Sequence, residues 1–338
     1  MKLYCGIDLH SNNSYVVLLD EEDKIVYQKR LPNDLLGILE TLSSYKNIIE
    51  GIVVESTYNW YWLVDGLQAA GYKVHLANTT AIKQYAGLKY TDDKSDAIWL
   101  ARLLRLGLLE TGHIYPKEKR GIRELLRRRM FLVRQQTMSI LGIQGIITRY
   151  ENIPLSGDKI KREDDEKILR YVQNPQVRLA VQSQLKILRC IMDQVNHLEK
   201  NILQEIKNDV LFKLVKTLPG VGPILAMTIL LETGEIKRFE NAGNYSSYCR
   251  CVESKRISNA KKKGENNRKN GNAYLGWAYI EAANFAIRYH EPIKRYYQRK
   301  LSKTKRVVAL KTIANKLSKA CYFILRDGVE FEMKKAFG

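Results

Sequence analysis

Short apolar runs separated by turns dominate the first third of the chain, which is the pattern of strands in a sheet. Residues 2–9 and 14–20 form two such runs, with four polar residues between them. This spacing predicts a β-hairpin, and the run at 24–31 extends it by a third strand. Helices and strands are then expected in alternation, at 33–45, 48–55, 60–70, 73–77 and 93–106. The pattern predicts an α/β fold around a mixed sheet.

Helical periodicity dominates the rest of the chain. An arginine-rich helix is expected from Lys117 to Tyr150, and after a polar break the periodicity resumes as far as Lys216. We interpret this stretch as a long antiparallel helical hairpin of the coiled-coil type and a candidate for dimerisation. Later helices are expected at 224–232, 272–290 and 304–326. The sequence thus predicts an α/β domain at 1–112, a helical linker at 113–216 and a small helical domain at 217–338.

Positive charge is abundant and unevenly distributed. The 338 residues include 56 Lys and Arg against 36 Asp and Glu, a net charge of +20. From Arg250 to Lys311 the count is 17 against 4. An excess of this size is typical of proteins whose partner is a polyanion such as nucleic acid. No apolar run approaches the roughly 18 residues of a membrane span, so we expect a soluble intracellular protein that does not enter a membrane.

Four acidic residues occupy positions where predicted strands end or a helix begins. Asp8 and Glu55 end strands, and Asp93 and Asp96 lie three residues apart on one face of a helix. In a ribonuclease-H-like sheet, such positions converge on one edge. Mg²⁺ takes oxygen ligands, and a pair of such ions stabilises the attacking and leaving oxygens of a phosphoryl transfer. The acids therefore predict a Mg²⁺ site that acts on a phosphodiester.

Each acid also has a structural interpretation when it is taken alone. Negative charge is favoured at the start of a helix, so Asp92 or Asp93 can be an N-cap and nothing more. The mutual repulsion of clustered carboxylates without a cation favours the metal site over this alternative.

A glycine-containing turn, Leu218-Pro-Gly-Val-Gly-Pro, precedes the apolar helix expected at 224–232. The turn resembles the hairpin of a helix-hairpin-helix unit. In such a unit Gly220 and Gly222 would let backbone N–H groups approach a phosphate. An ordinary helix–helix turn is the alternative.

Basic side chains gather in two further places, the helix that begins at Lys117 and the loop around Ser258. The residues expected to contact nucleic acid there are Arg123, Arg127, Arg128, Arg256, Lys261, Lys262, Lys263, Arg268 and Lys269. A solvated helix face is the alternative interpretation of the arginines.

Ser258 is a candidate nucleophile because of its basic surroundings. A serine hydroxyl is a poor nucleophile unless a base or a cationic setting stabilises its alkoxide. Arg256 precedes Ser258 and three lysines follow it, which supplies such a setting. The alternatives are a polar loop residue or a phosphate donor, and Ser254 is a nearby rival for the same role.

With these residues in view, the chain resembles the DEDD transposases of bacterial insertion sequences, insertion-sequence family one-ten. The resemblance extends throughout its length and rests on several blocks in a fixed order. They are Gly6-Ile7-Asp8, Val54-Glu55-Ser56-Thr57, Thr91-Asp92-Asp93-Lys94-Ser95-Asp96-Ala97, Leu218 to Pro223, Arg238-Phe239, Ser258-Asn259 and Gly271-Asn272. One difference is Asn259-Ala260 after the serine, where the family has glycine nearby.

The resemblance implies a RuvC-like N-terminal domain, a coiled-coil linker and a helical C-terminal domain that bears a serine. It implies that Asp8, Glu55, Asp93 and Asp96 bind Mg²⁺ and that Ser258 attacks DNA to form a phosphoserine link. It further implies a structured bridge RNA whose loops pair with target and donor DNA, and composite active sites shared between the protomers of a dimer or tetramer. We therefore expect an RNA-guided recombinase of the bacterial cytoplasm, associated with the nucleoid.

Two other functions are compatible with the sequence. A RuvC-like Holliday-junction or structure-specific nuclease would use only the four acids, with Ser258 as a phosphate contact. A basic nucleic-acid-binding scaffold would use neither the acids nor the serine for chemistry. A covalent adduct between the protein and DNA distinguishes the recombinase from both.

Overall fold

The structure is a computed structural model that describes residues 1–82, 92–265 and 270–338. By their internal contacts the described residues form two compact units. The first unit contains Met1–Lys117 and Ser254–Asn270, and the second contains Glu118–Glu253 and Gly271–Gly338. The division into three parts at 1–112, 113–216 and 217–338 remains a prediction. Contacts group the basic loop with the N-terminal residues, which the sequence pattern did not indicate.

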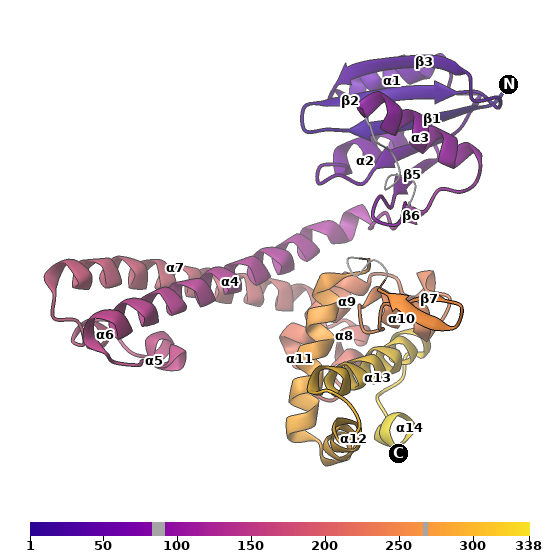
Figure 1. The fold of residues 1–338 in the computed structure, drawn as a ribbon. Coiled ribbons are helices and arrows are strands. Elements are labelled where there is room, and N and C mark those ends of the chain that lie inside the picture. The colour runs from indigo at the N-terminus through magenta and orange to yellow at the C-terminus, as the bar shows by residue number, and fades with distance from the viewer. Residues whose placement is uncertain (83–91, 266–269) are drawn as a thin grey trace. The chain divides into compact units, whose positions relative to one another are not determined.

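Within the described part of the first unit, six strands form one mixed sheet in the order β3-β2-β1-β4-β5-β6 (Figure 1). The strands are β1 (Leu3–Leu9), β2 (Asn13–Leu19), β3 (Ile25–Pro32), β4 (Ile49–Glu55), β5 (Val74–Ala77) and β6 (Thr111–Gly112). The first three are antiparallel neighbours, whereas β4 lies parallel to β1 and to β5. The predicted mixed sheet and α/β fold are confirmed, and the arrangement is consistent with a ribonuclease-H-like fold.

Helices cover both faces of this sheet. The helices of the first unit are α1 (Leu35–Ser43), α2 (Tyr61–Ala69) and α3 (Asp93–Arg105). Odd-numbered residues of β1, from Leu3 to Leu9, share one hydrophobic core with α1 and α2. The opposite face carries Val17 and Val53, which pack against α3 in two smaller clusters. Because side chains alternate along a strand, Asp8 on β1 and Glu55 on β4 belong to the face that α3 covers.

The second unit is helical, as the sequence predicts. Its elements are α4 (Lys117–Glu151), α5 (Gly157–Arg162), α6 (Asp165–Leu169), α7 (Pro175–Ile206), α8 (Val210–Val215), α9 (Pro223–Thr233), η2 (Ile236–Arg238), α10 (Ala242–Tyr248), α11 (Ala273–Tyr289), α12 (Glu291–Leu301), α13 (Arg306–Asp327) and α14 (Met333–Phe337). The long helices α4 and α7 run side by side (Figure 1). They share the core of Ile143, Ile147, Val181 and Leu185. The polar break expected after α4 contains one short helix, α5.

A second core joins the C-terminal helices, from α8 to α14. Its largest fully buried side chains are Tyr245 and Tyr279. The hydroxyl groups of these tyrosines lie 2.8 Å apart, and the Tyr245 hydroxyl is also 2.8 Å from Thr233 Oγ1. Each buried hydroxyl therefore has a hydrogen-bond partner, as a buried polar group requires.

The segment around Ser258 forms a hairpin of two short strands, β7 (Arg256–Ser258) and β8 (Lys261–Gly264). Ser258 pairs with Lys261 across a two-residue turn. Asn259 and Ala260 form that turn with positive φ angles of 51° and 57°, as a type I′ turn requires. The sequence pattern indicated a basic loop here and did not indicate strands.

Gly6 permits a close approach between β1 and α3. A Cβ atom added at Gly6 would lie 2.0 Å from the carbonyl oxygen of Ala97 and 2.9 Å from the backbone nitrogen of Ala101. Both atoms belong to the α3 backbone, which cannot move aside as a flexible side chain can. The absence of a side chain at Gly6 therefore determines how near α3 lies to the strand that carries Asp8.

We expect Gly6→Ala to push α3 away from β1 and to reduce the free energy of unfolding by about 3 kcal/mol, because overpacking a backbone contact is strongly destabilising. Urea unfolding of the full chain measures this change. The matched control is Gly51→Ala on β4, where an added Cβ meets only side-chain atoms at 3.5 Å. An equal loss in both variants would contradict the role given to Gly6.

Candidate functional site

Strand ends and a helix start bring acidic residues together in the first unit, as the sequence predicts. Asp8 lies near the end of β1 and is buried, with 1% of its surface exposed. Glu55 ends β4, which is hydrogen-bonded to β1, and its carboxyl group contacts that of Asp8. Asp93 and Asp96 lie in the first turn of α3, which packs on β1.

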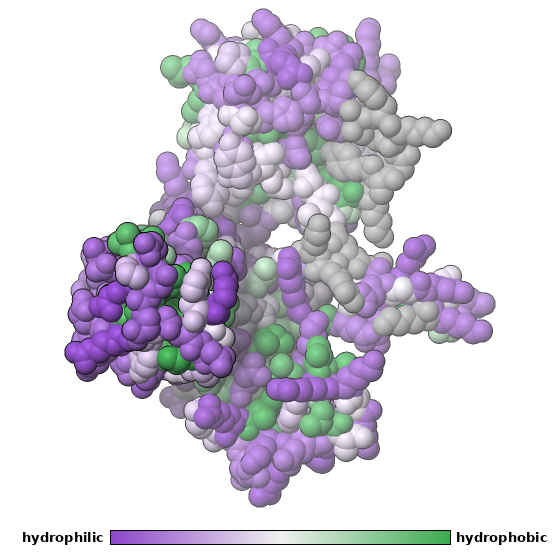
Figure 2. All heavy atoms as spheres, turned by 60° about the vertical axis from the view of Figure 1, so that its left-hand side comes forward, coloured by the Kyte–Doolittle hydropathy of each residue, from purple (hydrophilic) through white to green (hydrophobic). Residues whose placement is uncertain are grey.

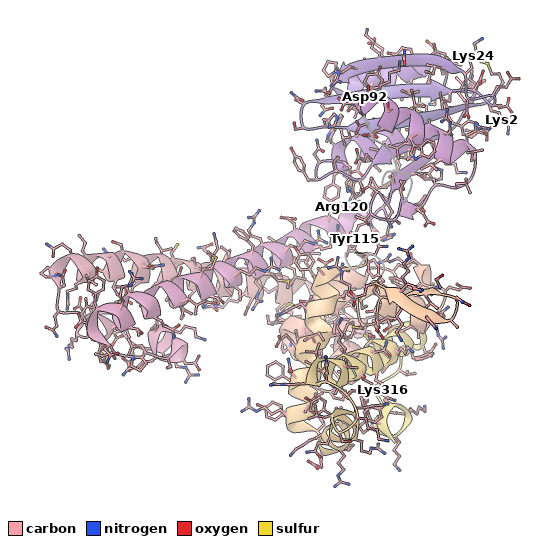
Figure 3. All side chains as sticks on the ribbon, in the orientation of Figure 1. Lys2, Lys24, Asp92, Tyr115, Arg120 and Lys316 are labelled. Atoms are coloured by element: carbon pink, nitrogen blue, oxygen red, sulfur yellow. The ribbon has the colours of Figure 1, made fainter. Side chains whose placement is uncertain are left out.

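Asp92 is the N-cap of α3 (Figure 3). Its carboxylate accepts hydrogen bonds from the backbone nitrogen and the hydroxyl of Ser95. The hydrogen bonds from Ser95 lower the pKa of Asp92. The structural role considered for an acid at this helix start therefore belongs to Asp92, which leaves Asp93 and Asp96 available for a ligand.

Two basic side chains that the sequence pattern did not indicate face Asp93. The guanidinium group of Arg30 donates to Asp93 Oδ2 at 2.6 Å. His10 Nε2 lies 3.0 Å from Asp93 Oδ1 and 3.1 Å from Asp8 Oδ2. The sheet register explains Arg30, because Asp8 pairs with Tyr15 and Tyr15 pairs with Arg30.

Burial and neighbouring charges shift the pKa values of Glu55, Asp96 and Asp93 in different directions. Burial, then the contact and the negative charge of Asp8, raise the pKa of Glu55 to about 8. Burial and the charge of Asp8 also raise the pKa of Asp96. Burial alone would raise the pKa of Asp93, but its contacts with Arg30 and His10 outweigh this effect and lower it. The site thus concentrates more negative charge than its own cations neutralise.

The residues present fit a divalent cation. Asp8 Oδ2 is buried and has no hydrogen-bond partner among the described residues, and the same is true of His10 Nε2. One ligand atom from each of Asp8, His10 and Asp93 lies within 4.8 Å of the others. A buried carboxylate oxygen without a partner is unfavourable, and a cation bound to it would remove that penalty.

The arginines of α4 differ in the exposure of their side chains. Arg127 forms a bidentate ion pair with the buried Glu232 of α9, at 2.7 and 2.9 Å, and its guanidinium lies 4.9 Å from the Tyr274 ring centroid. Arg123 is 9% exposed, whereas the side chain of Arg128 is 58% exposed. Of the three α4 arginines expected to bind nucleic acid, Arg128 is thus the most accessible one.

The glycine turn has two distinct glycines. Gly220 has a φ angle of 77°, and a Cβ atom there would lie 2.2 Å from the carbonyl oxygen of Ala282 on α11. Packing against α11 therefore requires glycine at this position. A Cβ at Gly222 would meet nothing within 4 Å, so this residue faces open space beside the first turn of α9. A pocket of about 560 Å³ lies over the turn, with Phe285 and Tyr289 in its lining.

Ser258 is exposed at the end of β7. Its cross-strand neighbour is Lys261, and residues directly opposite in an antiparallel pair project from the same face. Lys263 lies where the register shifts at a β-bulge, so strand alternation does not assign it to that face. Ser254 is only partly exposed, and its hydroxyl oxygen is buried. The side chain of Lys262 and the whole of Arg268 and Lys269 lie outside the described residues.

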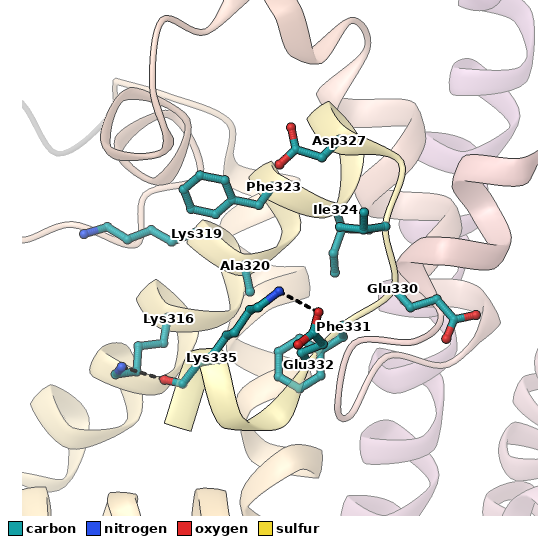
Figure 4. A pocket seen from close by; sticks show the side chains of 12 residues that line it. Lys316, Lys319, Ala320, Phe323, Ile324, Asp327, Glu330, Phe331, Glu332 and Lys335 are labelled. Atoms are coloured by element: carbon teal, nitrogen blue, oxygen red, sulfur yellow. Dashed lines mark hydrogen bonds and ion pairs between the residues drawn. The ribbon is translucent and has the colours of Figure 1, made fainter. Parts of the chain in front are cut away.

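A further pocket of about 470 Å³ lies beside α13 and the C-terminal tail (Figure 4). Lys316 and Lys335 in its lining already have partners, the carbonyl oxygen of Ala336 and the carboxylate of Glu332, both at 2.7 Å. It contains none of the candidate residues.

Hydrophilic side chains cover most of the surface visible in Figure 2. Among the described helices, none has the length and apolar character that crossing a membrane requires.

Comparison with known proteins identifies similar sequences for both ends of the chain. A family model described as "Transposase", for the DEDD group of IS110, matches residues 5–151, and one described as "Transposase IS116/IS110/IS902 family" matches residues 212–298. The transposase for insertion sequence element IS1111A of Coxiella burnetii is 22% identical over 294 residues, which are 84% of this chain and 78% of that protein. An insertion element IS110 protein of 43.6 kDa from Streptomyces coelicolor is 27% identical over 162 residues, 47% of this chain and 40% of that protein.

We expect the metal-free protein to lose stability as pH rises from about 4.5 to about 8. Over this range the folded state keeps the proton of Glu55 that the unfolded state has already released, so the folded state binds more protons and deprotonation favours unfolding. Thermal denaturation in the presence of a chelator measures the slope. Glu55→Gln, which cannot ionise, flattens it, and an unchanged slope in this variant would contradict the assignment.

We expect Arg127→Met to reduce the free energy of unfolding by about 3–5 kcal/mol, because it leaves the Glu232 carboxylate buried without its counter-ion. Arg128→Met is the matched control on the same helix, where an exposed pair contributes at most about 1 kcal/mol. Chemical denaturation of both variants tests this. Should Arg127→Met unfold like the wild type yet bind nucleic acid weakly, Arg127 would belong to the binding surface instead.

Proposed function

Because the chain belongs to the IS110 family of transposases, we propose that it cuts and rejoins DNA by a two-part mechanism, in which carboxylates hold divalent cations and Ser258 is the nucleophile. The observation that carries the proposal is the convergence of Asp8, Glu55, Asp93 and Asp96 at the first turn of α3, together with an exposed serine on a basic hairpin.

The four acids are the proposed Mg²⁺ ligands. A bound cation would neutralise the negative charge that raises the pKa of Glu55 and Asp96, and it would supply Lewis-acid stabilisation of phosphate oxygens. Arg30 keeps Asp93 ionised and so prepares it to bind the ion. The sheet and α3 hold the ligands on regular elements, which fixes their geometry more tightly than loops would.

Ser258 carries the proposed covalent step. Its Oγ bonds to the phosphorus as the bond from phosphorus to one nucleotide oxygen breaks, and the serine proton ends on the departing hydroxyl group. Attack by a hydroxyl of another strand reverses the reaction and joins the new partners. Lys261 shares the face of Ser258, where its charge would stabilise the serine alkoxide and hold the phosphate.

Nucleic acid is proposed to contact Arg256, Lys261 and Lys263 in the first unit, and Arg128 and Gly222 in the second. These side chains are exposed, or in the case of Gly222 open to a ligand. The guide is proposed to be a structured bridge RNA, because base pairing then supplies sequence specificity while the basic protein holds the backbone. The net charge of +20 favours such a partner.

Assembly into dimers or tetramers is proposed to use the α4–α7 hairpin as a coiled coil. Apolar side chains remain exposed along it, among them Met138 and Leu141 on α4 and Leu179 and Ile187 on α7, each more than half exposed. Exposed apolar side chains repeated along a helix are typical of a surface that another helix covers.

We expect the wild-type protein, with guide RNA, Mg²⁺ and target DNA, to form a covalent adduct with DNA that survives denaturing electrophoresis. Ser258→Ala abolishes the adduct, because the attacking oxygen is gone. Asp8→Asn reduces it by at least about 100-fold, since it removes a ligand from the electrostatic stabilisation of the transition state.

Ser254→Ala is the matched control, two residues before the same hairpin, and leaves the adduct unchanged. DNA cleavage without any adduct, dependent on Asp8 but not on Ser258, would replace the recombinase by a nuclease that uses the acids alone. If the protein still binds nucleic acid and neither Asp8 nor Ser258 affects any reaction, the protein is a nucleic-acid-binding scaffold.

A further inference from the structure

We propose that His10 is a direct ligand of the cation held by Asp8 and Asp93, so that the site offers one imidazole nitrogen besides its carboxylate oxygens. The inference rests on the proposed metal site and adds a ligand to the four acids. It gives the site a preference for cations that accept nitrogen ligands, Mn²⁺ among them.

The spacing of the donor atoms matches one coordination shell. His10 Nε2 is 3.1 Å from Asp8 Oδ2 and 3.0 Å from Asp93 Oδ1. Two adjacent ligands of an octahedral ion, each about 2.1 Å from it, are roughly 3.0 Å apart. All three donor atoms lie within 4.8 Å of one another, as ligands of one ion do.

Hydrogen bonding within the protein does not account for this arrangement. His10 Nε2 carries at most one proton, so it cannot give each of the two oxygens beside it a well-aligned hydrogen bond of its own. Both His10 Nε2 and Asp8 Oδ2 are buried atoms without a hydrogen-bond partner in the described residues. The side chain of Asp8 is 2% exposed, so water does not readily compensate its oxygen. A cation between the donors satisfies both atoms at once.

The backbone of His10 is fixed by neighbouring side chains. Its carbonyl oxygen accepts hydrogen bonds from the amides of Asn33 at 2.9 Å and Asn59 at 3.0 Å. Its N–H group donates to the carbonyl oxygen of Asn13 at 2.9 Å. These contacts hold the turn after β1 so that the imidazole lies over Asp8. Fixed ligands reduce the entropy lost when a metal binds.

A nitrogen ligand changes which cation the site prefers. Mg²⁺ is bound through oxygen and keeps several of its waters, whereas imidazole suits later divalent metals, whose affinity rises from Mn²⁺ along the first transition row. The carboxylates alone would hold Mg²⁺ and Mn²⁺ with similar strength. His10 therefore strengthens Mn²⁺ binding more than Mg²⁺ binding.

Electron spin-echo spectroscopy of full-length protein loaded with Mn²⁺ tests the proposal directly, because a coordinated imidazole gives a ¹⁴N modulation. We expect this signal in the wild type, its loss in His10→Ala and its retention in His75→Ala, a histidine on β5 that faces Gly51 and not the acids. Calorimetric titration should show Mn²⁺ binding weakened by about tenfold or more in His10→Ala, since even indirect supports of a ligand contribute 10- to 100-fold. Mg²⁺ binding should change much less.

Asp8→Asn separates this inference from the proposed metal site. If Asp8→Asn loses Mn²⁺ while His10→Ala keeps both its affinity and its ¹⁴N signal, the acids hold the metal and His10 is not a ligand. If Asp8→Asn binds Mn²⁺ like the wild type, the metal site itself is wrong and the inference falls with it. His10→Gln replaces His10→Ala should the smaller side chain disturb the turn, and circular dichroism checks the folding of every variant.

Discussion

The backbone contact between β1 and α3 at Gly6 controls the geometry of the first unit. Since no Cβ separates the two elements, the helix start lies against the strand that carries Asp8. The carboxylates of Asp93 and Asp96 then approach a buried acid, and β4 brings Glu55 to the same edge. Close packing of the backbone and crowding of negative charge are thus two consequences of one missing side chain.

Basic side chains offset the negative charge of the four acids mainly at Asp93. Arg30 and His10 both lie at Asp93, and they keep its pKa low despite burial. Burial and the charge of Asp8 raise the pKa values of Glu55 and Asp96, and His10 offsets this rise only in part at Asp96. At Glu55, whose pKa is raised to about 8, the folded protein tolerates this imbalance by holding a proton at neutral pH. A bound cation would replace that proton, so metal binding is expected to strengthen as pH rises.

The sequence predicted much of this arrangement, for reasons that can be stated residue by residue. Strand periodicity placed Asp8 and Glu55 at strand ends, and the spacing of Asp93 and Asp96 placed them on one helix face. Arg30 could not be predicted, because it reaches the site through a strand register that links it to Tyr15 and then to Asp8. Register depends on which strands pair, and periodicity alone does not specify it. His10 was visible as a polar residue two positions after Asp8, but a turn residue has no preferred direction in a sequence pattern.

The arginines of α4 and the glycines of the turn before α9 show a second limit, because a sequence pattern does not reveal which of two like residues is packed in the fold. Arg127 and Arg128 are neighbours with the same charge, yet one is paired with the buried Glu232 and the other is exposed. Glu232 lies more than a hundred positions away, so only the fold reveals that pair. The sequence likewise does not distinguish Gly220 from Gly222, although only Gly220 packs closely against a neighbouring helix, α11.

The turn after Ser258 shows how a departure from the family pattern is accommodated. A two-residue turn keeps Lys261 directly opposite Ser258, and it requires positive φ at both Asn259 and Ala260. Asparagine adopts that conformation readily, whereas alanine in it is disfavoured by roughly 1 kcal/mol. A longer turn would relieve Ala260 but would move the lysine away from the serine. The strain at Ala260 is therefore the consequence of a register that keeps a positive charge beside the proposed nucleophile, and glycine near this serine would permit the same register without the strain.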